Sequence, residues 1–177
     1  SMVDGASLTA GTTNELYGDA YELALSMPVP MVDGASLTAG YANTDGISVK
    51  RDDREEYAAA VKYSYGPVSV GYQKTLLNNS FKDGQAGGEA WVKGTMYGVS
   101  YSVNDNLAVS YQMNESQKKI SNGASSGQSD KQEASGFSVS YSIGGMSLAY
   151  VDNSFDNHGY NASVNKDYKQ VVLGVAF

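Results

Sequence analysis

The sequence contains no cysteine, three prolines and a single histidine among its 177 residues. The absence of cysteine excludes a disulfide framework, a cysteine-based zinc site and a thiol nucleophile. No apolar run approaches the roughly 20 residues that a membrane-spanning helix needs. Positive charge is also scarce, because 12 Lys and Arg stand against 19 Asp and Glu and leave a net charge of −7. This balance, without any basic stripe, argues against a nucleic-acid partner.

Period-two alternation of apolar and small polar residues is what the sequence has in abundance. In the segment 97–103, aromatic and aliphatic residues alternate with Gly98, Ser100 and Ser102. The same pattern recurs along most of the chain and predicts strands with two different faces. We expect about ten strands, near residues 6–12, 17–27, 35–43, 56–65, 68–77, 91–103, 106–115, 135–143, 146–153 and 168–177.

One stretch is ambiguous. Glu55–Lys62 is rich in strong helix formers and is compatible with a helical turn. We interpret it as a strand, because the alternation continues through Tyr63 and Tyr65.

The polar face of these strands indicates the class of sheet. A soluble sandwich usually presents many charges on its solvated face, whereas this face consists of Ser, Gly, Ala, Gln and few Lys. Small uncharged residues suit the wall of a water-filled lumen. Tyr residues near strand ends suit the membrane interface, where the ring is apolar and the hydroxyl stays wet.

The connections alternate between long and short. The long ones run over Asn43–Glu55, Leu77–Glu89, Glu115–Glu133 and Asn153–Asp167, and the short ones over Tyr65–Val68, Val103–Leu107 and Ile143–Met146. Outer-membrane barrels combine tight periplasmic turns with longer, polar extracellular loops. The sequence therefore predicts an all-β fold, an antiparallel up-and-down transmembrane β-barrel, as a single domain over residues 1–177.

A ten-residue segment occurs twice without change. Met2–Gly11 recurs as Met31–Gly40. We interpret each copy as a turn followed by a strand, with Leu8 and Leu37 facing lipid. Ten identical residues indicate a recent hairpin duplication or an error of sequence assembly, and not an old solenoid with diverged repeats.

The C-terminal strand carries a family resemblance. The segment 168–177 ends on Phe177 and places Val171, Leu173 and Val175 on the same face. It resembles the terminal strand of bacterial outer-membrane barrels, whose final aromatic residue is read by the barrel-assembly machinery. Met96–Tyr111 and Gly144–Tyr150 resemble Gram-negative porins of the alphaproteobacterial kind.

The resemblance implies an outer-membrane porin that passes small hydrophilic solutes and ions by passive diffusion, with no catalytic step, cofactor or metal. Members of that family are homotrimers of 16-stranded barrels, so this chain would be the C-terminal part of an N-terminally truncated porin that lacks the constriction loop. Ser1–Asp4 show no signal peptide, which fits a truncation or a mature N-terminus. Two alternatives stay open: a self-closed barrel of about ten strands, and a structural or anchoring barrel whose lumen is filled by side chains and does not conduct.

The position of each residue in the period-two alternation, here called its parity, predicts which residues line the lumen. They are Glu22, Ser36, Lys62, Gln73, Ser100, Gln112, Ser138 and Ser140. Among them, Glu22 and Lys62 are candidates for a charge field that biases ion selectivity; the alternative is a merely hydrated wall. Lys93 falls on the lipid-facing parity near a strand end, where it could snorkel to the interface.

Two candidate chemical sites compete with simpler explanations. His158, with Asp156 nearby, raises the hypothesis of a hydrolase at the barrel rim, but we favour a solvated loop histidine because no catalytic motif accompanies it. The carboxylates of Asp52, Asp53 and Glu55–Glu56 raise the hypothesis of a divalent-cation site. Their spacing is not that of an EF-hand loop, so we favour a solvated loop here as well.

Overall fold

The structure is a computed structural model that describes residues 6–15, 18–46, 53–79, 86–122 and 127–175. No helix within these ranges is long and apolar enough to cross a membrane. The regular structure there consists of strands: β1 (Ser7–Glu15), β2 (Gly18–Pro28), β3 (Ala35–Thr44), β4 (Arg54–Tyr65), β5 (Val68–Asn78), β6 (Ala86–Ser102), β7 (Leu107–Asn122), β8 (Gly127–Gln128), β9 (Gln132–Ile143), β10 (Met146–Asp156) and β11 (Lys166–Val175).

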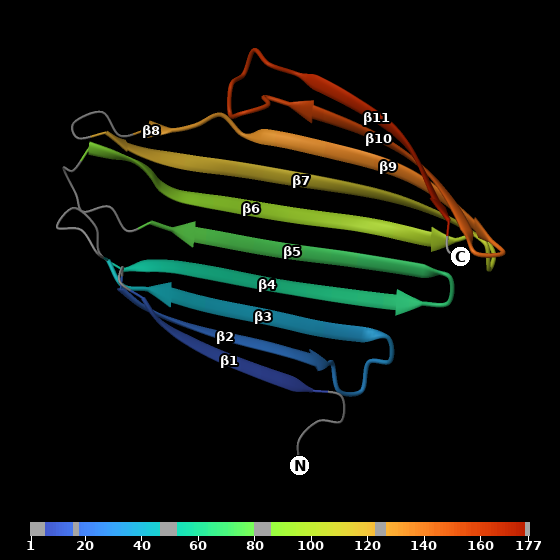
Figure 1. Ribbon diagram of the computed structural model, residues 1–177, viewed down its shortest axis with the longest axis horizontal. Coiled ribbons are helices and arrows are strands. Elements are labelled where there is room, and N and C mark those ends of the chain that lie inside the picture. The colour runs from blue at the N-terminus through green and yellow to red at the C-terminus, as the bar shows by residue number, and fades with distance from the viewer. Residues whose placement is uncertain (1–5, 16–17, 47–52, 80–85, 123–126, 176–177) are drawn as a thin grey trace.

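The strands form one antiparallel up-and-down sheet, which confirms the predicted all-β class. They lie side by side in chain order, β1 to β7 and then β9 to β11, while the two-residue β8 pairs with β7 alone. Figure 1 shows this order from β1 at the bottom to β11 at the top, with the short turns at the right. β1 and β11 are the two edges and do not pair with each other, so the structure is an open sheet and not the self-closed barrel of about ten strands.

Several strands extend further toward the long connections than the alternation predicted. β6 begins at Ala86 instead of residue 91, and β7 continues to Asn122 instead of residue 115. The predicted long connection over residues 115–133 was therefore wrong at both of its ends, because β9 already begins at Gln132 and β8 lies between. The physical reason is that a strand ladder is held by backbone hydrogen bonds, which continue where apolar side chains no longer alternate.

The ambiguous stretch over residues 55–62 is a strand. It lies within β4, and its residues pair in continuous register with β3 on one side and β5 on the other. Intrinsic helix propensity is a weak preference that such tertiary pairing overrides.

The short connections have the backbone conformations that tight hairpins require. Gly144 and Gly145 have φ angles of 55° and 81° between β9 and β10, as in a type I′ turn. Between β6 and β7, the Asn104 side-chain oxygen accepts hydrogen bonds from the backbone N–H groups of Asn106 and Leu107, both at 2.9 Å. This Asx-type closure holds the turn without glycine.

The sheet has no apolar core within the described residues. No hydrophobic side chain there is buried. The exposed fraction is 67% at Leu8, Val171 and Leu173 in the strands, and it is higher still at Tyr65 and Met31. Monomeric soluble proteins rarely leave a continuous apolar face of this kind open to water. The described sheet by itself therefore leaves this apolar face uncovered.

The two copies of the repeated segment flank the same strand. Ser7–Gly11 lies in β1 and Ser36–Gly40 in β3, with β2 between them. Leu8 and Leu37 lie opposite Leu25 and Met27 of β2, on the face that carries the apolar side chains. In the second copy a turn at 31–34 precedes the strand, as predicted; residues 2–5 of the first copy lie outside the described ranges.

Candidate pore-lining face

The cross-strand register places all the predicted lumen residues on one face of the sheet. Directly opposite residues share a face, and one row across the sheet joins Ser36, Lys62, Gly71, Gly98 and Gln112. Further rows on this face hold Ser69, Ser100, Ser110 and Ser138; Ser140 and Ala149; Gln73 and Met96; Glu22, Ala42 and Glu56. We call this the polar face; its role in lining a pore stays a prediction.

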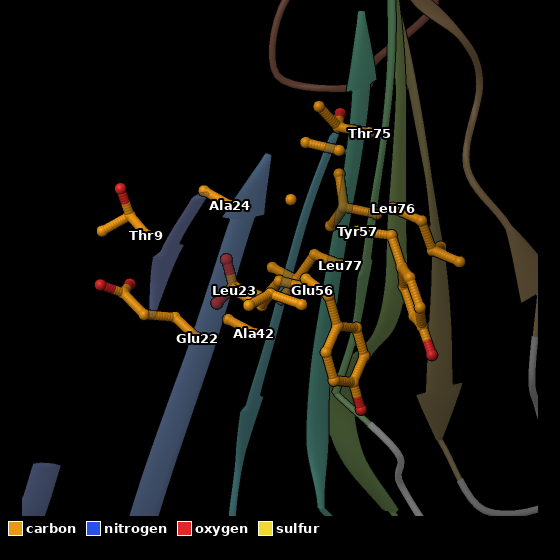
Figure 2. Close-up of a pocket in the computed structure, with 14 residues that line it drawn as sticks. Thr9, Glu22, Leu23, Ala24, Ala42, Glu56, Tyr57, Thr75, Leu76 and Leu77 are labelled. Atoms are coloured by element: carbon orange, nitrogen blue, oxygen red, sulfur yellow. The ribbon is translucent and has the colours of Figure 1, made fainter. Parts of the chain in front are cut away.

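The polar face is hollowed because its residues are small. One hollow of about 420 Å³ lies over β1 to β6, and Gly40, Ala42 and Ala58 are among the small residues that line it. Figure 2 shows Thr9, Glu22 and Ala24 on one side of these strands and the Tyr57 ring on the other. A second hollow of about 280 Å³ lies over β4 to β7 and is lined by Lys62, Gln73, Gln112 and their glycine neighbours.

Hydroxyl groups on the polar face pair with each other across strands. The Ser64 and Ser69 side chains are 2.8 Å apart, and so are those of Ser110 and Ser138. Hydroxyls both donate and accept, so they satisfy each other and can still bind water. The wall is thus polar without carrying charge over most of its area.

Charges on the polar face are mostly paired near the long connections. Arg54 contacts Glu56 at 2.6 Å, and Lys118 contacts Glu89 at 3.2 Å. Within the described part of the chain, Glu22 and Lys62 form no hydrogen bond or ion pair. The two residues predicted as candidates for a pore field are therefore uncompensated charges on this wall.

The opposite face carries the aromatic and aliphatic side chains, and we call it the apolar face. Tyr21, Tyr41 and Tyr57 stack obliquely in sequence, with ring centroids 5.9 Å and 5.0 Å apart. Toward the long connections this face becomes polar: Tyr41 donates a hydrogen bond to Glu55 at 3.4 Å. At the same end Lys169 contacts Asp152 at 3.1 Å. An apolar band that ends in hydrogen-bonded tyrosines and ion pairs has the layout of a membrane interface.

Lys93 lies on the apolar face, as its parity predicted. Its ammonium nitrogen is 4.4 Å from the centroid of the Trp91 ring, within cation–π range. Trp91 lies opposite Asn78 and Lys119, beyond the apolar band. The snorkelling of Lys93 to a membrane interface stays a prediction.

The C-terminal strand presents its predicted assembly residues on the apolar face. Val171 lies opposite Tyr150, and Leu173 opposite Leu148. Val175 lies opposite Met146 at the turn end of the strand. Phe177 lies outside the described residues, and the signal role of this strand stays a prediction.

The residues of the two candidate chemical sites lie at strand ends and in the connections beside them. His158 lies in the connection after β10. Its ring centroid is 5.9 Å from that of Phe155, and its backbone N–H donates a hydrogen bond to the carbonyl oxygen of Val164. Glu55 and Glu56 point to opposite faces of β4, and Asp53 accepts a hydrogen bond from the Gly46 N–H at 3.1 Å; Asp52 is outside the described ranges. No group of three or more His, Asp or Glu side chains among the described residues could hold a metal ion.

Sequence reasoning missed part of the polar face. Arg54 and Glu56 pair there, and Leu77 and Val92 add an apolar patch beside them. Counting in steps of two along β4 from Lys62 reaches Glu56 and Arg54, and counting along β5 from Gln73 reaches Leu77. The two-residue period of these strands could therefore have placed all three on the polar face.

Comparison with known proteins adds no assignment. No protein-family model matches the chain, and no curated protein matches it.

Proposed function

We propose that this chain forms part of the wall of a Gram-negative outer-membrane porin. Such a porin is a water-filled channel for passive diffusion of small hydrophilic solutes and ions. One observation carries the proposal: over the described residues, a sheet without a buried apolar core separates an exposed apolar face from a hollowed polar face of small residues. Lipid on the first face and water on the second satisfy both sets of side chains.

The open edges of the sheet fit a larger barrel. Unpaired strand edges are not tolerated in lipid, so β1 and β11 must find strand partners in the membrane. We propose that the sheet is a portion of a barrel of about 16 strands, a size that leaves an aqueous channel. As in other porins, the assembled form would be a homotrimer inserted by the barrel-assembly machinery through β11.

The test is ion conductance of the refolded protein, which must include the strands that pair with β1 and β11 and close the barrel. The protein is refolded in detergent, and a heat-modifiable gel band with strand-dominated circular dichroism verifies that a sheet has formed. We expect its addition to a planar lipid bilayer to produce stepwise conductance. A folded sample that inserts without conducting would overturn the proposal and favour a structural barrel with a filled lumen. A matched sample denatured by boiling controls for leaks caused by detergent.

A further inference from the structure

We infer that Lys62, Gln73 and Gln112 form a subsite for small oxyanions on the wall of the channel. The inference rests on the proposed function and adds the chemical class of solute that this wall favours. It starts from the row that runs across β4 to β7 through Lys62, Gly71, Gly98 and Gln112. Both ends of this row carry long side chains, and the two positions between them carry none.

The glycines create the space that the two long side chains border. Neighbouring strands lie about 4.8 Å apart, so Lys62 and Gln112 stand about 14 Å apart across the row. The hollow of about 280 Å³ lies between them, and Gln73 and Met96 of the neighbouring row border it as well. A Cβ atom added at Gly98 would lie 3.1 Å from the Tyr111 carbonyl oxygen and 3.4 Å from the Gln112 Cβ. A side chain there would crowd Gln112.

The polar atoms around this hollow are available to a solute. Within the described residues, Lys62, Gln73 and Gln112 have no hydrogen-bond or ion-pair partner. An ammonium group and two amide groups offer donors from both sides of the space. Such donors match the acceptor oxygens of a phosphate or carboxylate, and the amide oxygens can also accept from hydroxyl groups.

The electrostatics of the polar face favour an anion at this place. The closest carboxylate along β4 on this face is that of Glu56, six residues from Lys62 and so about 20 Å away. Arg54 already neutralises it at 2.6 Å. Among the described residues, Lys62 is therefore a positive charge without an ion-pair partner. It is set between Val61 and Tyr63 at a depth where the other face is apolar.

The first experiment measures ion selectivity in bilayers across a KCl gradient. Salt should be low, because the Debye length is about 30 Å at 0.01 M and about 3 Å at 1 M. We expect Lys62→Gln to lower the chloride-to-potassium permeability ratio about fourfold at low salt, because a unit charge about 10 Å away in water changes the occupancy of each ion about twofold and in opposite directions. At about 1 M salt the ratio should change little. Lys62→Arg should keep the wild-type ratio. Lys74→Gln is the matched control, because Lys74 lies on the apolar face beside Tyr72.

The second experiment asks whether the amides belong to the subsite. Inorganic phosphate is added to the conducting channel, and the reduction of current is compared between wild type and the double variant Gln73→Ala, Gln112→Ala. We expect the double variant to keep its permeability ratio but to lose most of the inhibition by phosphate.

The outcomes separate this inference from the function on which it rests. A complete, folded wild-type barrel that does not conduct would refute the proposed channel, and the subsite with it. A conducting channel whose permeability ratio is the same in Lys62→Gln and wild type would overturn the subsite alone. Equal phosphate inhibition in the double variant would also overturn it.

Discussion

Gly34 closes the connection between β2 and β3 in a conformation that a side chain would disturb. Its φ angle is 80°, and its carbonyl oxygen accepts a 2.8 Å hydrogen bond from the Ser64 N–H of β4. A Cβ atom added there would overlap the Ser64 carbonyl oxygen. Gly66 also has a positive φ, 54°, but no atom lies within 4 Å of an added Cβ. Comparing alanine substitutions at the two glycines therefore separates the free-energy cost of a strained backbone from that of steric overlap.

At the scale of the residue, we expect Gly34→Ala to lower the free energy of unfolding by about 3 kcal/mol, since overlap adds to a strained φ. Gly66→Ala should cost about 1 kcal/mol, for the left-handed conformation alone. Urea unfolding of the refolded protein, followed by the fluorescence of its single tryptophan, measures both. Equal losses in the two variants would contradict the contact between Gly34 and β4.

A single strand presents the two environments side by side. In β6, Val99 lies opposite Val70 and Tyr111 on the apolar face, while Ser100 lies opposite Ser69 and Ser110 on the polar face. If the first face meets lipid and the second meets water, the same charged substitution must have different costs at these neighbouring positions.

At the scale of the element, we expect Val99→Lys to destabilise the lipid-inserted protein by about 2–4 kcal/mol, the cost of a lysine near the bilayer midplane. Ser100→Lys should change stability by about 0.5 kcal/mol or less, as for a solvated surface position. Denaturant titrations in lipid vesicles give both values. The membrane assignment fails if Ser100→Lys is the more damaging of the two.

The whole sheet has unlike ends. β3, β5 and β7 end at the left of Figure 1, where they lead into long connections, and the short turns after β4, β6 and β9 lie at the right. Lys131 lies in the connection before β9, and Asp105 lies in the turn after β6. During insertion from outside a vesicle, the end with small turns crosses the bilayer more easily, because each transferred polar group costs free energy.

At the scale of the molecule, we therefore expect one orientation in sealed vesicles. Trypsin added outside should cleave after Lys131, while a protease that cleaves before aspartate should leave Asp105 intact. Fragment masses identify the cleaved bonds, and the same digestion in detergent should expose both sites. Cleavage at Asp105 in sealed vesicles, as fast as in detergent, would contradict the orientation.

Much of the fold and of the polar face could be predicted from the sequence. The strand identity of residues 55–62 and the shared face of Lys62, Gln73 and Gln112 both followed from parity. The extension of β7 to Asn122 could not be predicted, because no alternation marks it and backbone pairing with β6 sustains it. The same two-residue period also places Arg54 and Glu56 on one face, but the sequence analysis did not predict their ion pair.

The sequence by itself determined which side chains share a face, because the two-residue period of a strand is a local property of each strand. It also determined where hairpins turn, through residues such as Gly144 and Asn104. The tertiary structure alone decided which residues stand opposite one another, since register depends on pairing between distant segments. The glycine gap between Lys62 and Gln112 exists only because β4 to β7 pair in this register.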